Sequence, residues 1–193
     1  MDDRLILKEE FLQFREQCIW LRCCYNTYCE LYESDDQVKE LMEKVAVHFF
    51  MDLNKILIDY VQLQMCKVTD PAQSFGKDNL TVKYFICKLE EFDLLTEEID
   101  KLSNSIAEYR DILNGGRNKI ISHLDKETVM NDLVLGEHDV EKVYQFFDDL
   151  QQYTDAVGKV LGVDPTDYTT CAGRGDVLDL IQYLQVRDEI NDE

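Results

Sequence analysis

One segment of the sequence, residues 115–125, combines reactive side chains with a break in the backbone. Two glycines precede Arg117, and His123 follows that arginine by six residues, with Asn118 between them. Imidazole titrates near neutral pH, so His123 can accept a proton from a ribose 2′-hydroxyl or donate one to a leaving 5′-oxygen. A guanidinium can hold the charged phosphorane between these steps. The segment therefore predicts acid–base cleavage of RNA, in which the substrate supplies its own nucleophile and no metal ion is required.

The same two residue types also have a purely structural explanation. Arg on a helix is more often solvent-facing, and His is more often a packed residue at an interface. A step of six residues turns an α-helix through roughly 240°. Arg117 and His123 therefore do not share one face as an i,i+4 pair does, although they can flank one groove.

Positive charge is concentrated around this segment. The whole chain has a net charge of −20, whereas residues 101–126 hold five basic and three acidic residues. The acidic balance argues against a broad nucleic-acid-binding face, and no DNA binding is expected. The locally basic stretch still admits an anion, and we expect Lys119 and Arg110 within it to contact the substrate.

Length and composition favour one soluble domain. The chain has 193 residues, of which 45% are hydrophobic and 31% charged, which is enough for one core. It opens with Met1-Asp2-Asp3-Arg4 and contains no run of about 18 uncharged apolar residues. We therefore expect neither a signal peptide nor a membrane span, and a cytoplasmic location.

The cysteines are predicted to be reduced. There are seven, an odd number, and four of them fall within one helical pattern: Cys18, Cys23, Cys24 and Cys29. A disulfide framework makes no geometric sense there. A zinc site is the alternative, but the group has no Cys-x-x-Cys spacing and no nearby His. We expect packing thiols, with no metal and no cofactor.

Apolar residues recur at steps of three and four through most of the chain, which is the helical period. With two Pro, eight Gly and no alternating strand runs, a sheet has little support. We expect an all-α bundle of four long helices, with a short inserted helix near residues 79–92 and a C-terminal helix. Residues 1–165 are expected to form the bundle, and residues 166–193 a C-terminal loop and helix packed on it.

Three local expectations follow from the same patterns. The second long helix is predicted to stop just before Pro71 and to carry one continuous apolar stripe. The stripe consists of Met42, Val45, Phe49, Leu53, Ile56, Tyr60 and Leu63. His48 is predicted to be a partly buried packing residue. Asp148 and Asp149 are predicted to lie on a solvated face.

Arg117, Asn118 and His123 resemble the signature of the HEPN superfamily of helical-bundle RNases and RNA-binding proteins. Residues 67–71 (Lys-Val-Thr-Asp-Pro), the short helix after them and residues 117–125 resemble the abortive-infection AbiU-type branch, found in prokaryotic defence and toxin contexts. The likeness covers roughly residues 40–150 in its general plan.

This resemblance implies a HEPN bundle and a two-fold homodimer that brings two Arg–His pairs into one cleft. It implies metal-independent endoribonuclease action, with Arg117 and His123 as the catalytic pair and Asn118 orienting a phosphate or the imidazole. RNA, a second copy of the chain and a cognate antitoxin protein are the partners that it implies, with no membrane. The alternative is a non-catalytic helical module of the same fold that binds RNA or a protein.

Treatment with EDTA should leave both fold and assembly unchanged, because none of the predicted roles uses a metal ion. Far-ultraviolet circular dichroism and light scattering before and after chelation measure this. Loss of helical signal in EDTA would instead support a zinc site among the cysteines of the first helix.

Overall fold

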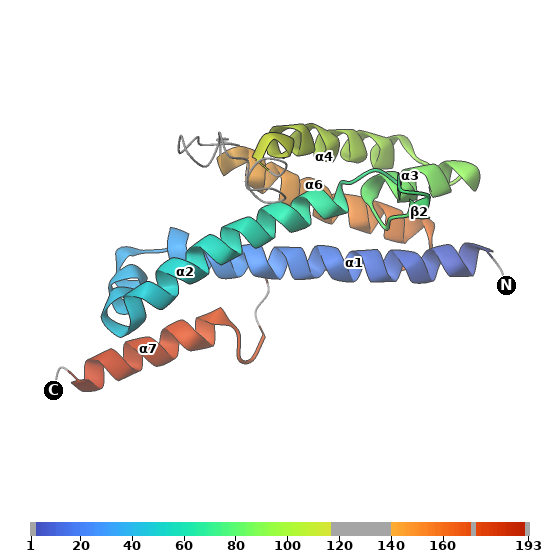
Figure 1. The fold of residues 1–193 in the computed structure, drawn as a ribbon. Helices are drawn as coiled ribbons and strands as arrows, with labels where there is room; N and C mark the ends of the chain where they lie inside the picture. Colours follow the sequence, from blue (N-terminus) through green and yellow to red (C-terminus); the bar gives the residue numbers. More distant parts are fainter. Residues whose placement is uncertain (1–2, 117–139, 171–172, 192–193) are drawn as a thin grey trace. The chain divides into compact units, whose positions relative to one another are not determined.

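The structure is a computed structural model that describes residues 3–116, 140–170 and 173–191. Its helices are α1 (Asp3–Tyr28), a π-helical turn η1 (Cys29–Glu33), α2 (Asp36–Val68), α3 (Val82–Glu91), α4 (Glu97–Gly116), α6 (Val140–Val160) and α7 (Val177–Asn191). A small hairpin, β1 (Gln73–Ser74) and β2 (Lys77–Asp78), precedes α3 (Figure 1). The predicted all-α class is confirmed. None of the described helices is long and apolar enough to cross a membrane.

The chain divides into two compact units, which we describe separately. The first unit contains residues 1–20 and 62–167, and the second contains residues 21–61 and 168–193.

Aromatic side chains hold the first unit together. The ring centroid of Phe85 in α3 lies 5.8 Å from that of Phe11 and 5.1 Å from that of Phe14, both in α1. All three side chains are fully buried. The buried hydroxyl of Tyr153 in α6 donates to the Val82 carbonyl oxygen over 3.0 Å, so its one polar group is satisfied. These contacts join α1, α3 and α6 around one core.

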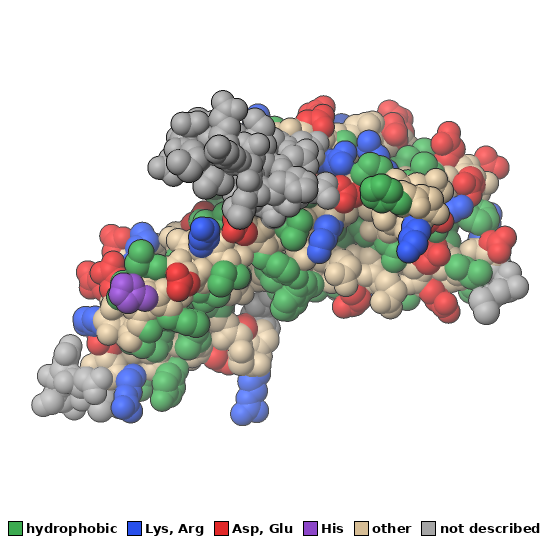
Figure 2. Space-filling model, in the orientation of Figure 1, with side chains coloured by type: hydrophobic (Ala, Val, Ile, Leu, Met, Phe, Trp, Pro, Cys, Tyr) green, Lys and Arg blue, Asp and Glu red, His purple; other side chains and the backbone are tan. Residues whose placement is uncertain are grey.

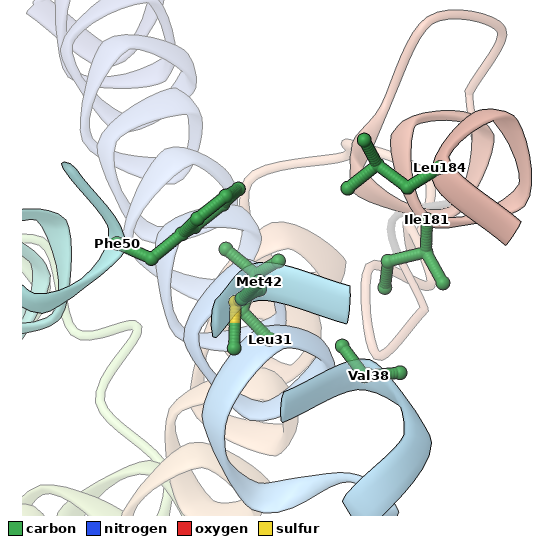
Figure 3. Close-up of a cluster of buried hydrophobic side chains, with 6 residues drawn as sticks. All are labelled: Leu31, Val38, Met42, Phe50, Ile181 and Leu184. Atoms are coloured by element: carbon green, nitrogen blue, oxygen red, sulfur yellow. The ribbon is translucent and has the colours of Figure 1, made fainter. Parts of the chain in front are cut away.

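A second hydrophobic cluster forms the core of the second unit (Figure 3). Leu31, Val38, Met42 and Phe50 pack there against Ile181 and Leu184 of α7. The Tyr32 hydroxyl donates to the Phe50 carbonyl oxygen over 2.8 Å. Lys44 and Asp188 form an ion pair of 2.8 Å between α2 and α7. The C-terminal helix is thus joined to residues 31–50 by both apolar and polar contacts.

The prediction of one continuous stripe along α2 is wrong. The helix is interrupted at Ala46, whose backbone is extended with φ −162° and ψ 66°. The face that packs into the core instead contains Met42, Ala46, Phe50, Leu53 and Leu57, on both sides of the interruption. Val45, Phe49 and Ile56 of the predicted stripe are each more than half exposed. His48 is also exposed, which corrects the prediction of a partly buried histidine.

A hairpin replaces the loop expected at residues 73–78. Gln73 pairs with Asp78 and Ser74 with Lys77, which leaves Phe75 and Gly76 as the loop residues. Their φ angles are +51° and +75°. The Gln73 side-chain amide donates to the Asp78 carboxylate over 2.8 Å, which adds a side-chain contact across the two strands. A two-residue loop with positive φ at both positions needs the type I′ conformation, which favours Asn-Gly and disfavours a bulky first residue.

Replacing Phe75 with Asn should stabilise the protein by about 1 kcal/mol, because Asn tolerates the left-handed backbone better than Phe. The Phe75 side chain is fully exposed, so its removal sacrifices no packing within the chain. Urea unfolding of the wild type and the variant measures the difference. Phe75→Ala is the matched control, because it removes the ring without supplying a residue suited to positive φ. Equal stability of the Asn and Ala variants would contradict the backbone explanation.

Candidate functional site

The predicted site residues fall into two groups. Arg117, Asn118, Lys119 and His123 lie outside the described residues, so their predicted roles stay predictions. Arg110 is described, on the last third of α4. The structure therefore shows the helix that leads to the Arg–His segment, together with the surroundings of Arg110.

Helix α4 is firmly packed against α6. Ile106, Tyr109 and Leu113 of α4 are buried, and the Tyr109 ring centroid lies 5.1 Å from that of Phe146. Burial raises the pKa of Tyr109, so its hydroxyl stays protonated at neutral pH. The apolar face of α4 fixes the orientation of the opposite, more polar face.

A buried carboxylate strengthens this contact between the two helices. Asp149 of α6 accepts hydrogen bonds from the Ser105 hydroxyl over 2.5 Å and from the Gln145 side-chain amide over 2.8 Å. The prediction of a solvated Asp149 is wrong, whereas its neighbour Asp148 is exposed as expected. Two donors reduce the cost of burying a charge, so Asp149 has a structural explanation that requires no catalytic role.

Arg110 forms an ion pair with Asp70, forty residues earlier in the chain. The Arg110 Nη2 atom lies 3.3 Å from Asp70 Oδ1, and the two side chains are 17% and 21% exposed. Asp70 belongs to the turn that closes α2, where the backbone N–H of Asp70 donates to the Lys67 carbonyl oxygen. The pair therefore ties the end of α2 to α4.

The guanidinium of Arg110 is only partly accessible. Its Nε atom is buried and makes no hydrogen bond within the described part of the chain, so an anion from solvent can reach only the outer N–H groups of this side chain. A guanidinium has five N–H donors in one plane and can bind a carboxylate and a phosphate at the same time. The described partner of Arg110 is Asp70, and its contact with substrate stays a prediction.

The turn, hairpin and start of α3 carry a second locally basic stretch, which the sequence analysis did not identify. Residues 67–83 hold three lysines and two aspartates in a chain of net charge −20. Asp70 pairs with Arg110, and Asp78 accepts the Gln73 amide. Lys67, Lys77 and Lys83 are exposed and form no ion pair with described residues. Figure 2 shows Lys and Arg side chains among the acidic ones over this part of the first unit.

The described thiols offer little nucleophilic chemistry. All six described cysteines are free, and burial raises the pKa of Cys24 and Cys29 to about 11. These two thiols therefore stay protonated at neutral pH, which makes them poor nucleophiles. Cys87 of α3 is the exposed one among the six.

Breaking the Arg110–Asp70 pair should destabilise the first unit. Asp70→Ala leaves a mostly buried guanidinium without its carboxylate and should cost about 1–3 kcal/mol. Adding Arg110→Met should recover part of that loss, which urea unfolding of the double-mutant cycle measures as a coupling of about 1 kcal/mol. The matched control is the more exposed pair Lys88–Glu91 at 2.8 Å. Its coupling should stay below about 0.5 kcal/mol, and equal couplings would contradict a special role for Arg110.

A family model described as AbiU2, of HEPN type, matches residues 5–180. The match is wider than the likeness recognised in the sequence and extends from α1 into α7, so both units belong to it. No curated protein and no solved structure matches the chain. This chain is a member of the AbiU2 family of HEPN proteins.

Proposed function

We propose that this protein is a metal-independent endoribonuclease of the prokaryotic defence or toxin–antitoxin type. The observation that carries the proposal is the pattern Arg117, Asn118, His123, which starts directly after α4 in a chain of the AbiU2 family. The well-packed helix α4, which carries Arg110 and ends directly before this segment, supports it further.

In the proposed reaction, the RNA supplies the nucleophile. The His123 imidazole accepts the proton of a ribose 2′-hydroxyl, and the 2′-oxygen attacks the adjacent phosphorus. The bond from phosphorus to the 5′-oxygen breaks, and that oxygen takes up a proton from an imidazolium. Arg117 stabilises the additional negative charge on the phosphorane oxygens, and Asn118 orients the phosphate or the imidazole. The products are a 2′,3′-cyclic phosphate and a free 5′-hydroxyl.

A homodimer supplies the second titrating group in this proposal. The reaction uses one base and one acid, and the candidate segment has a single histidine. Two copies related by a two-fold axis bring two histidines to one cleft. A flexible, single-stranded or looped RNA is the expected substrate, because a regular duplex holds the 2′-hydroxyl out of line with the leaving oxygen.

A non-catalytic interaction module is the second candidate. The observation that favours it is the exposed apolar surface of α2, where Val45, Phe49, Met51 and Ile56 are each more than half exposed. Exposed apolar side chains on one helix are typical of surfaces that bind another protein. In a toxin–antitoxin system the partner would be the cognate antitoxin.

Cleavage of labelled RNA in EDTA tests the nuclease proposal. Wild type should release fragments that end in 2′,3′-cyclic phosphate, and His123→Ala and Arg117→Ala should each lower the rate at least about 100-fold. His48→Ala is the matched control, because His48 is exposed on α2 in the second unit and should not affect the rate. Equal inactivity of wild type and variants on varied RNAs, with capture of a defined antitoxin, would favour the interaction module.

Dilution tests whether two copies of the chain contribute to one active site. If both copies contribute to one cleft, the activity per chain should fall once light scattering shows dissociation into monomers. A monomer that keeps full activity would contradict the shared cleft and leave the proposed chemistry intact.

A further inference from the structure

A cavity of about 230 Å³ lies in the first unit, between α3, α4 and the turn that closes α2. Val82 and Ile106 line it with fully or nearly fully buried side chains, and Ala107 also lines it from α4. Lys83, Asp100 and Asn104 contribute polar groups, and all three are exposed residues. Apolar walls with a few polar groups are typical of sites that bind a flat, partly polar ring.

The cavity lies next to the Arg110–Asp70 pair. Thr69 lines the cavity and directly precedes Asp70, while Ala107 lines it and lies three residues before Arg110. Residues three apart on a helix are neighbours on its surface. A ligand whose ring fills the cavity can therefore place an anionic group near Arg110, whose side chain is partly exposed and pairs with Asp70.

Lys83 adds a second cation for that anionic group. Its side chain lines the cavity, it is exposed, and it takes part in no ion pair within the described chain. A ring beside two cationic side chains matches the chemistry of a nucleotide, which joins a planar base to a phosphate.

The polar groups distinguish among the bases. The Asn104 side-chain amide approaches Asp100 Oδ2 at 3.4 Å, a long contact that a ligand donor can replace, so both carboxylate oxygens of Asp100 can accept from a ligand. A carboxylate accepts two hydrogen bonds from adjacent N–H donors, and the guanine edge presents such a pair at N1 and N2. Adenine presents a single donor group there and matches the carboxylate less well.

We propose that this α3–α4 cavity binds a guanine base of the RNA, with Arg110 and Lys83 holding the phosphate of that nucleotide. The proposal rests on the proposed nuclease function and adds a preference of that nuclease for RNA that contains guanine. Arg110 follows Asn104 by six residues of α4, about 9 Å along the helix axis at 1.5 Å per residue, and Gly116 at the end of α4 follows Arg110 by another six. The bound guanine would select which phosphodiester enters the catalytic cleft.

The thiol of Cys87 provides a direct measurement, because it lines the cavity and is exposed. Guanosine 5′-monophosphate should slow iodoacetamide alkylation of Cys87 several-fold, as followed by mass spectrometry of its peptide, while uridine 5′-monophosphate should have a much smaller effect. The Cys87→Ser variant lacks this thiol, so the alkylated peptide that disappears in the variant is the one that contains Cys87. No protection by either nucleotide would overturn the proposal, and so would equal protection by both.

A cavity-filling variant tests the location. Ala107→Met should weaken binding of guanosine 5′-monophosphate at least tenfold, measured by calorimetry, whereas the matched control Ala107→Ser leaves the cavity open and should bind as wild type does. Asp100→Asn should lose the preference for guanine over adenine, since an amide cannot accept both N–H bonds. Unchanged binding in Ala107→Met, with circular dichroism showing an intact fold, would place the nucleotide elsewhere and overturn the proposal.

The cleavage assay separates this inference from the proposed function. If wild type cuts RNA with no dependence on guanine and Cys87 is not protected, the cavity proposal fails and the nuclease stands. If guanosine 5′-monophosphate protects Cys87 but no RNA is cut, the cavity binds its ligand and the nuclease proposal fails.

Discussion

The packing of α4 against α6 is the contact on which the candidate site depends. Tyr109 and Phe146 join the two helices at their apolar faces, and the buried Asp149 holds Ser105 across the same interface. Because this face is fixed, Arg110 and the residues of α4 that line the cavity keep one orientation. If α4 could rotate, the distance and orientation between Arg110 and the cavity would vary. A specific site on α4 therefore requires the packed core of the first unit.

Charge is the second constraint. A chain of net charge −20 repels a polyanion at long range, so an RNA must be bound by local contacts. Exposed cations in the described part of the first unit include Lys67, Lys77 and Lys83, while Arg110 pairs with Asp70. Asp70 orients the guanidinium and also weakens its net positive charge. For the proposed nuclease, the expected consequence is selective, salt-sensitive binding of a short stretch of RNA rather than tight coating of long RNA.

Local sequence preference and structure disagree at two instructive places. Phe75 occupies a position whose positive φ favours Asn, and no local rule predicts an exposed aromatic residue there. Ala46 interrupts α2 although neither Gly nor Pro marks the site. In both cases the backbone is set by its surroundings: the paired strands of the hairpin at Phe75, and the cluster around Phe50 and α7 near Ala46.

The sequence by itself determined the all-α class, most helix positions and the AbiU2 likeness, because the helical period, the caps and the Arg117–His123 spacing are local properties. It could not reveal the Arg110–Asp70 pair, whose members are forty residues apart, or the burial of Asp149, since both depend on how helices meet. The same holds for the α3–α4 cavity, which takes its walls from three elements. Hydrophobic periodicity predicts which face of a helix is apolar. Only tertiary packing decides which elements that face contacts and which polar groups come together beside it.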